Sequence, residues 1–402
     1  MLCAMDTALP LPALLQSGHE SALDICIVTE TFPPEINGVA RTMSRLVEGL
    51  RARGHRVHVV RPRQIIDNTT PSDTTLVAGI QLPLYKELRL GLPARQTLRQ
   101  LWIQTRPDAV YIATEGPLGH SAMREAQYQN ILALSGFHTN FHSYSSHYRL
   151  GPLKHLVFHY LRRFHNRTTC TLAPSPELVS RLRQQGFHAV EQMARGVDID
   201  LFSPQRRKTA LRREWGFEDN HLGVLYVGRI AAEKNLALAE RAFRHIQKKY
   251  TQARFVLVGD GPLRTRLERR NPDFVFRGMH TGIPLAEHYA SADLLLFPSM
   301  TETFGNVVLE AMASGLAVLA YDYAAPRMHI HSGHNGVTVP LGDEALYLAG
   351  ADRLALPPSQ LRSMGAAARS AAEALSWERI VQRFETLLWD YIDSDEVEHE
   401  YA

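Results

Sequence analysis

The segment that most constrains this chain runs from Pro298 to Gly315, between two apolar stretches. The stretches at 293–297 and 316–321 have the composition of buried strands. Residues 307–313 between them are rich in helix formers, so the segment joins a strand to a helix and the helix to the next strand. Its polar start therefore lies where a parallel strand ends, which is the edge at which open α/β sheets bind ligands.

The start of the expected helix is suited to an anion. Gly305 and Asn306 fall near its N-terminus. Backbone N–H groups there point outward, and the helix dipole favours negative charge.

Two carboxylates, Glu302 and Glu310, stand eight positions apart in this segment. On one ideal helix that spacing is about 12 Å along the axis. A retaining glycosidase needs its two carboxyl groups about 5 Å apart and an inverting one under about 10 Å, so the spacing disfavours a hydrolytic pair. Each carboxylate is better suited to accept hydrogen bonds from different hydroxyls of one extended ligand. Two solvated surface glutamates would fit the spacing equally well.

The pattern from Glu302 through Phe304-Gly305 to Glu310-Ala-Met-Ala-Ser-Gly resembles the donor-site signature of glycosyltransferase family 4. Members of that family are retaining, nucleotide-sugar-dependent enzymes of the GT-B fold. The resemblance implies that Glu302 binds the donor sugar, that the backbone of Phe304, Gly305 and Asn306 approaches it closely, and that Glu310 binds the ribose.

Length and composition agree with an α/β fold of two Rossmann-like domains facing a cleft. The chain has 402 residues, 45% apolar and 21% charged, which is globular and too long for one ordinary core. We expect an N-terminal extension at 1–22, an acceptor domain at 23–197, a donor domain at 198–375, and a helix at 376–402 that crosses back. The net charge of +3 gives no reason to expect a nucleic-acid partner.

The cysteines and the apolar segments favour a cytoplasmic protein. Cys3, Cys26 and Cys170 are odd in number and form no Cys-x-x-Cys pair, which suits a reducing compartment. The apolar patch near the start is interrupted by prolines and lacks a basic region before it, so we expect no signal peptide. No stretch approaches the roughly 20 apolar residues of a spanning helix.

The first domain is expected to open with a βαβ unit. Strands are predicted at 24–28 and 56–60, with an amphipathic helix at 39–53 between them. The joining loop ends in Asn37-Gly38, which is a common helix-launching turn, or a place where the backbone approaches another group or takes a positive φ. The resemblance implies that Gly38 lines the donor diphosphate.

A histidine follows another predicted strand in this domain. A strand at 109–113 and a helix at 118–132 lead to Gly136-Phe137-His138. His138 could be a general base, a hydrogen-bond partner of a sugar hydroxyl, or a structural residue. In the resembling family a histidine at this position reaches the donor sugar, which makes His138 a catalytic candidate.

Basic and aromatic residues interleave at roughly helical spacing over residues 144–167. This pattern suits either peripheral contact with an anionic membrane, here the cytoplasmic face of the inner membrane, or an ordinary solvated basic face. Further on, Asp198 and Asp200 form an Asp-x-Asp pair. Because two carboxylates alone make a weak metal site, we treat them as linker residues and predict no essential metal.

The second domain opens with a predicted strand at 222–227 followed by Arg229 and Lys234, before a helix at 236–250. This pair could converge on a diphosphate or belong to a solvated loop. The resemblance implies the diphosphate role, in which both cations stabilise the departing nucleoside diphosphate. It also implies backbone contacts to the nucleobase around Arg277 and Met279, after a short strand.

The end of the chain is expected to be helical. The pattern predicts helices at 356–375 and 377–389, and a frayed acidic tail after Asp390. The residues at 322–326 are predicted to form a loop.

The resemblance implies a retaining hexosyltransferase in which the donor diphosphate takes the acceptor proton, with His138, Glu302, Arg229 and Lys234 as the catalytic set. The closest motif likeness is to bacterial mannosyltransferases and glycolipid-forming enzymes. It favours GDP-mannose as donor substrate, a lipid or glycan hydroxyl as acceptor, and no cofactor. A glycolipid synthase using a UDP-sugar and a nucleotide-sugar epimerase are the alternatives.

Overall fold

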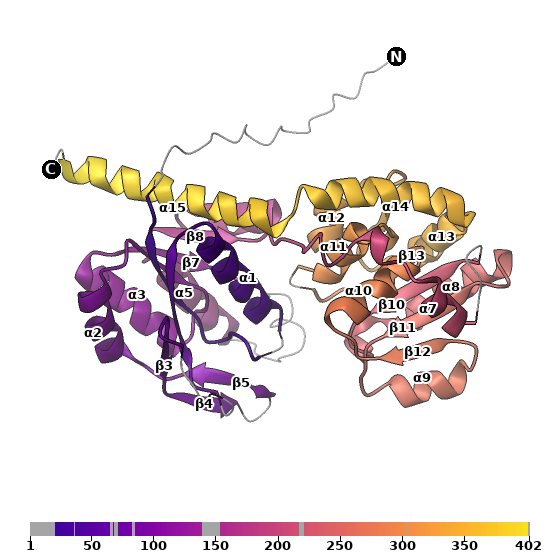
Figure 1. Cartoon of the computed structure of the whole chain (residues 1–402), viewed down its shortest axis with the longest axis horizontal. Coiled ribbons are helices and arrows are strands. Elements are labelled where there is room, and N and C mark those ends of the chain that lie inside the picture. Colours follow the sequence, from indigo (N-terminus) through magenta and orange to yellow (C-terminus); the bar gives the residue numbers. More distant parts are fainter. Residues whose placement is uncertain are drawn as a thin grey trace, which may run out of the picture.

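The computed structural model describes residues 21–35, 37–64, 67, 71–82, 85–138, 153–216, 221–302 and 304–400. The chain forms two α/β lobes, and the long helix α15 (Trp377–Glu400) lies along the first of them (Figure 1). Among the helices of these ranges, none combines the length and apolarity that crossing a bilayer requires.

The first lobe is built on a parallel sheet whose described strands run in the order β3-β2-β1-β6-β7-β8-β9. Its strands are β1 (Asp24–Val28), β2 (Arg56–Pro62), β3 (Thr74–Val77), β6 (Ala109–Ile112), β7 (Leu132–Gly136), β8 (Cys170–Ala173) and β9 (Val190–Gln192). Its helices are α1 (Gly38–Ala52), α2 (Arg95–Thr105), α3 (Pro117–Gln129), α5 (Leu153–His165) and α6 (Pro176–Gln184). An antiparallel hairpin, β4 (Gly79–Leu82) and β5 (Tyr85–Gly91), lies below the sheet in Figure 1.

The second lobe repeats this plan with the strand order β12-β11-β10-β13-β14-β15. Its strands are β10 (Gly223–Val227), β11 (Arg254–Val258), β12 (Val275–Gly278), β13 (Leu294–Phe297), β14 (Ala317–Tyr321) and β15 (Gly336–Val339). Its helices are α7 (Thr209–Glu214), α8 (Leu236–Lys249), α9 (Arg264–Arg270), α10 (Gly282–Ser291), α11 (Asn306–Ala313), α12 (Ala324–His329), α13 (Glu344–Leu354) and α14 (Pro358–Glu373), with short 3₁₀ turns at Pro204–Arg206 and Ala232–Lys234.

The central strands of both sheets are apolar and buried over most of their length. Each residue of β10 and β13 is buried, and β1 is buried from Ile25 onward. Strands buried on both faces are typical of parallel sheets covered by helices on both sides. The pairing is parallel between all neighbouring strands of the two sheets, so the carboxyl ends of each sheet lie along one edge.

The chain passes between the lobes twice, and the two passages pack against each other. The Val197 N–H donates a hydrogen bond of 2.9 Å to the carbonyl oxygen of Leu375. A Cβ atom on Gly196 would lie 2.8 Å from Cδ2 of Trp377, so only glycine allows this close approach. The connection between the lobes is therefore a pair of tightly packed segments.

Helix α15 is anchored to the first lobe by a buried carboxylate. Glu385 accepts hydrogen bonds from Arg53 Nε at 2.6 Å and from His55 Nε2 at 2.8 Å. His55 Nδ1 accepts the Leu23 N–H at 3.1 Å, which fixes the ring proton on Nε2. Beside them, Gly49 of α1 gives Val381 of α15 the room that a side chain would fill.

Most predicted boundaries agree within two residues, and three differences are larger. The helix expected at 118–132 ends at Gln129, because Asn130 takes a left-handed conformation and the chain then enters β7. The loop expected at 322–326 contains the start of α12. The acidic tail is not frayed over its whole length, since α15 continues to Glu400.

Candidate active site

The donor segment turns sharply between β13 and α11. Gly305 has φ +98°, a left-handed conformation that favours glycine, and it is the N-cap of α11. Gly305 has no side chain to cap the helix, and among the described residues no side-chain cap is found. Its first N–H groups are therefore directed at the space in front of the helix, as predicted for an anion site. Phe304, by contrast, is buried in the core of the second lobe.

Lys234 and Glu302 come together from different strand ends. Lys234 Nζ lies 2.5 Å from Glu302 Oε1, with both side chains mostly shielded from solvent. The Glu302 backbone N–H donates to the hydroxyl of Tyr323 at 2.8 Å, which fixes the loop that carries the carboxylate. Because β10 and β13 are neighbours in the sheet, the loops that follow them meet at the carboxyl edge.

Arg229 takes a different position from its predicted partner Lys234. Its side chain is 67% exposed and pairs with Glu233 at 3.4 Å. The hydroxyl of Tyr226 donates to the Arg229 carbonyl oxygen at 2.9 Å and holds the backbone of this loop. The guanidinium thus stands at the exposed rim, with a weak partner that an incoming diphosphate could replace.

Glu310 is buried and is held from both lobes. Its Oε1 lies 2.8 Å from Nη1 of Arg41 in α1, and its Oε2 accepts the hydroxyl proton of Tyr289 at 2.9 Å. Burial raises the pKa of Glu310, and the Arg41 charge and the Tyr289 hydroxyl oppose that rise. Glu302 and Glu310 are therefore separate anchors, with only Glu310 in a helix.

Of the two residues predicted near the nucleobase, Arg277 lies in β12 and Met279 directly follows it. Arg277 Nη2 pairs with Glu214 at 2.8 Å, so its side chain is directed at α7. Met279 is 71% exposed. The Gly278 carbonyl oxygen accepts the Gly259 N–H at 2.7 Å, which joins the two loops. None of these contacts brings Arg277 or Met279 to the Lys234–Glu302 pair.

Gly38 is the first residue of α1, and Asn37 is its N-cap. Asn37 Oδ1 accepts the N–H groups of Val39 and Ala40 at 3.1 and 2.8 Å. Gly38 does not have a positive φ. A Cβ on it would lie 3.4 Å from Nη1 of Arg195, so Gly38 marks a close approach to that guanidinium.

His138 follows β7, and its Nε2 lies 3.2 Å from the hydroxyl of Tyr111. Its Nδ1 is buried and has no hydrogen-bond partner within the described ranges. Burial lowers the pKa of His138 to about 3, and the nearby Arg195 charge contributes. His138 is therefore neutral near pH 7 and suited to hydrogen bonding, not to supplying charge.

Three residues that the sequence did not single out are part of this region. Arg41 holds Glu310, Arg195 lies beside Gly38, and Glu30 accepts the Leu118 N–H at 3.0 Å at the start of α3. In the sequence, each resembles an ordinary charged residue of a helix or loop. Only their contacts distinguish them.

Asp198 has structural partners. Its carboxylate pairs with Arg45 at 2.5 Å and accepts the Leu201 N–H at 2.9 Å. Among the residues that the structure describes, no three His, Cys, Asp or Glu side chains gather as a metal site would require. Asp198 is therefore an ion-pair partner and accepts a backbone N–H in the passage between the lobes.

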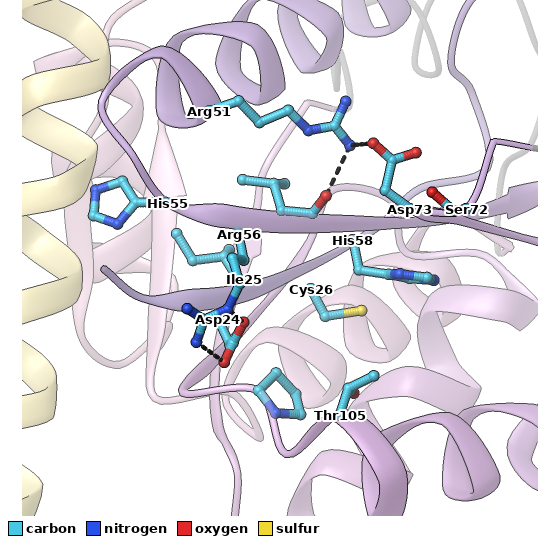
Figure 2. A pocket seen from close by; sticks show the side chains of 12 residues that line it. Asp24, Ile25, Cys26, Arg51, His55, Arg56, His58, Ser72, Asp73 and Thr105 are labelled. Atoms are coloured by element: carbon cyan, nitrogen blue, oxygen red, sulfur yellow. Dashed lines mark hydrogen bonds and ion pairs between the residues drawn. The ribbon is translucent and has the colours of Figure 1, made fainter. Parts of the chain in front are cut away.

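A hollow of about 400 Å³ lies at the opposite edge of the first sheet, beside the amino ends of β1 and β2 (Figure 2). The charged residues on its wall are paired, as the dashed lines show for Arg51 with Asp73 and for Arg56 with Asp24. Ligands of open α/β sheets bind at the carboxyl ends, so this hollow is separate from the candidate site.

Of the basic aromatic stretch, residues 144–152 lie outside the described ranges. The remainder forms α5, which buries Leu161 and Phe164. Its outer face leaves Leu156 66% and Tyr160 40% exposed, next to the exposed Arg163.

Family models match both lobes. Residues 36–201 match Glycosyltransferase Family 4, and residues 221–355 match Glycosyl transferases group 1. A GDP-mannose-dependent alpha-mannosyltransferase of Corynebacterium glutamicum is 32% identical over 375 residues, covering 92% of this chain and 88% of that protein. An alpha-monoglucosyldiacylglycerol synthase of Acholeplasma laidlawii is 25% identical, covering 92% and 98% of the two chains.

The fold is shared with solved structures. A sucrose-phosphate synthase from Thermosynechococcus elongatus superposes with a TM-score of 0.74 at 18% identity, covering 92% of this chain and 99% of the other. This confirms the predicted GT-B fold of two Rossmann-like domains. The family matches and the C. glutamicum relative confirm the predicted family and its enzymatic nature. The chain is a glycosyltransferase of group 1, family 4.

Proposed function

We propose that this enzyme transfers mannose from GDP-mannose, with retention of configuration, to a hydroxyl of a lipid or glycan. The observation that best supports this proposal is that Lys234, Glu302 and the start of α11 lie at the same edge of the second sheet. This arrangement offers a cation and outward N–H groups to a diphosphate, and a carboxylate to sugar hydroxyls. The GDP-mannose-dependent relative supports this choice of donor.

In the proposed complex, Lys234 exchanges its contact with Glu302 for a phosphate oxygen, and the freed carboxylate accepts sugar hydroxyls. Arg229 leaves Glu233 for the same diphosphate. Glu310 holds the ribose. These residues stabilise the leaving nucleoside diphosphate, and its oxygen takes the acceptor proton on the face where the bond breaks. No cofactor takes part.

Product analysis tests this proposal. The purified protein is incubated with GDP-mannose or with UDP-sugars, with and without a bacterial lipid extract, and the products are identified by mass spectrometry. We expect a mannosylated lipid when GDP-mannose and the lipid extract are both present, and no glycosylated lipid with the UDP-sugars. A UDP-sugar product would favour the glycolipid synthase, and donor turnover without a sugar-bearing lipid would count against the proposed acceptor. The family matches give the predicted epimerase alternative no support.

A matched pair of variants tests the site. Glu302→Gln keeps the size of the side chain and removes the charge that pairs with Lys234, and we expect transfer to fall by about a hundredfold or more. Glu268→Gln alters a partly exposed carboxylate on α9 that is also paired with a cation, Arg264 at 2.8 Å. It is expected to leave transfer unchanged. Equal rates for both variants would overturn the assignment of Glu302.

We further propose that the acceptor is reached at a membrane surface, through the outer face of α5. Exposed Leu156 and Tyr160 beside Arg163 suit the interface of an anionic bilayer. Next to Tyr160 lies a hollow of about 990 Å³ between the starts of α2 and α3, which is large enough for a sugar headgroup. The similarity to an alpha-monoglucosyldiacylglycerol synthase supports a lipid acceptor.

Co-sedimentation with vesicles of an anionic phospholipid tests the membrane contact. Leu156→Asp should reduce binding. Ile103→Asp is the control, because Ile103 on α2 is 60% exposed but lies on another helix. If wild-type protein stays in the supernatant at low salt, or if both variants behave alike, the proposed contact is wrong.

A further inference from the structure

Within the described ranges, Arg195 is a buried cation without a counter-ion. It follows β9, and only 6% of its surface is exposed. Its Nε is buried without a hydrogen-bond partner, and its guanidinium makes no ion pair within the part of the chain that the structure describes. Two carboxylates at the junction of the lobes are paired with other cations, Glu310 with Arg41 and Asp198 with Arg45. Charged groups this deeply buried are normally paired.

The guanidinium lies where the two lobes meet. On the first lobe, it approaches Gly38, whose missing side chain leaves the space in front of Nη1 open. On the second lobe, its Cζ lies 5.7 Å from the ring centroid of Phe304 in the donor segment. An arginine over an aromatic ring is held in orientation while its N–H groups stay available.

The charge persists in this environment. Burial lowers the pKa of Arg195 to about 10, which leaves the side chain protonated near pH 7. The segment that follows is fixed, because Gly196 and Val197 pack against the second passage between the lobes. A rigidly held, charged and unpaired guanidinium is preorganised for an anion.

We propose that Arg195 binds the diphosphate of the nucleotide-sugar donor, at the phosphate that carries the sugar. This inference rests on the proposed function, in which the nucleoside lies on the second lobe near Glu310. The sugar end of the donor then faces Gly38 and Arg195 on the first lobe. The planar guanidinium can donate two parallel hydrogen bonds to one phosphate, which Lys234 cannot.

The test compares GDP with GMP by titration calorimetry. Arg195→Met should weaken GDP binding by about tenfold or more, and leave GMP binding nearly unchanged, because GMP lacks the second phosphate. Arg195→Lys keeps the charge but loses the planar guanidinium. Its affinity for GDP should therefore lie between those of wild type and Arg195→Met. Arg206→Gln is the control, since Arg206 lies in the same passage and its guanidinium donates to the backbone carbonyl oxygens of Leu201 and Asp200.

Thermal unfolding separates this role from a structural one. Because Arg195 is unpaired without ligand, Arg195→Met should melt no lower than wild type in the absence of nucleotide. The upward shift that GDP produces should be smaller in the variant.

Four outcomes would contradict the inference. Equal loss of GDP and GMP binding, or a lower melting temperature with an intact GDP shift, would assign Arg195 a structural role. Unchanged GDP binding with a raised KM for the acceptor would place an acidic acceptor there instead. A wild-type protein that transfers sugar but binds GDP and UDP no better than GMP and UMP would refute the phosphate role alone. If it binds no nucleotide and transfers nothing, the proposed function itself fails.

Discussion

Arg41 Nη1 lies 2.8 Å from Glu310 Oε1, so a side chain of the first lobe holds a carboxylate of the second. The two residues are 269 positions apart in the chain. Under the proposed function, Glu310 is also the ribose anchor. The opposite lobe therefore completes the donor site and opposes the rise in the pKa of its carboxylate.

The first prediction concerns this contact and pH. Burial raises the pKa of Glu310, and Arg41 opposes that rise. Arg41→Met should move the acidic limb of GDP affinity to higher pH, because it removes the positive charge that opposes the rise in the pKa of Glu310. Titration calorimetry with GDP from pH 5 to 9 measures this shift in the pH dependence of affinity. Arg45→Met, on the same helix, is the control, and identical profiles for the two variants would refute the coupling.

The second prediction concerns Lys234. Lys234→Met removes the point charge beside Glu302, and kcat should fall by roughly 10²- to 10³-fold, because stabilisation of the leaving group is lost. Single-turnover assays with GDP-mannose check the rate, and circular dichroism checks the fold. Lys248→Met, near the end of α8, is the surface control. A decrease of less than threefold would exclude Lys234 from the chemical step.

The third prediction concerns Glu30 and stability. Burial, reinforced by Glu115, raises the pKa of Glu30 from 4.5 to about 7. The folded state then holds a proton that the unfolded state has lost, so stability should decrease as pH rises between about 4.5 and 7. The full decrease in the free energy of unfolding is roughly 3 kcal/mol.

Glu30→Gln keeps an oxygen that accepts the Leu118 N–H and removes the titration. Urea unfolding at pH 5 and pH 8 should therefore show a smaller loss of stability for Glu30→Gln than for wild type. The same loss in both proteins would show that Glu30 does not titrate in this range.

The fourth prediction concerns the anchor of α15. Glu385→Ala leaves Arg53 and His55 without their shared carboxylate, and should lower the free energy of unfolding by about 2–4 kcal/mol. Glu378→Ala changes an exposed residue of the same helix and should have almost no effect. Thermal denaturation of both variants measures the difference. If both variants lose only a small and similar amount of stability, α15 is held by its apolar contacts alone.

Local signals explain what the sequence predicted well. The alternation of apolar strands and amphipathic helices was sufficient for the two-lobe plan, because each βαβ unit is a local feature. The strand-to-helix turn at Gly305 was predictable from a glycine between a strand pattern and a helix pattern. The end of the helix before β7 was not, because Asn130 and the apolar residues after it also fit a helix pattern.

Contacts between distant segments explain what the sequence could not predict. Arg41, Arg195 and Glu30 acquire their surroundings only when separate strands and both lobes come together. The same holds for the difference between Lys234, which contacts Glu302, and Arg229, which stays at the rim. Five positions separate these two cations in the chain, but the 3₁₀ turn between them directs them differently.

The anomeric configuration of the first product tests the central claim most directly. The enzyme is incubated with GDP-α-mannose and the lipid fraction that it mannosylates, and the product is examined by NMR spectroscopy before any rearrangement. The account predicts an α-linked mannoside that forms with wild type and is lost with Glu302→Gln. A β-linked product, or mannose released only to water, would contradict it.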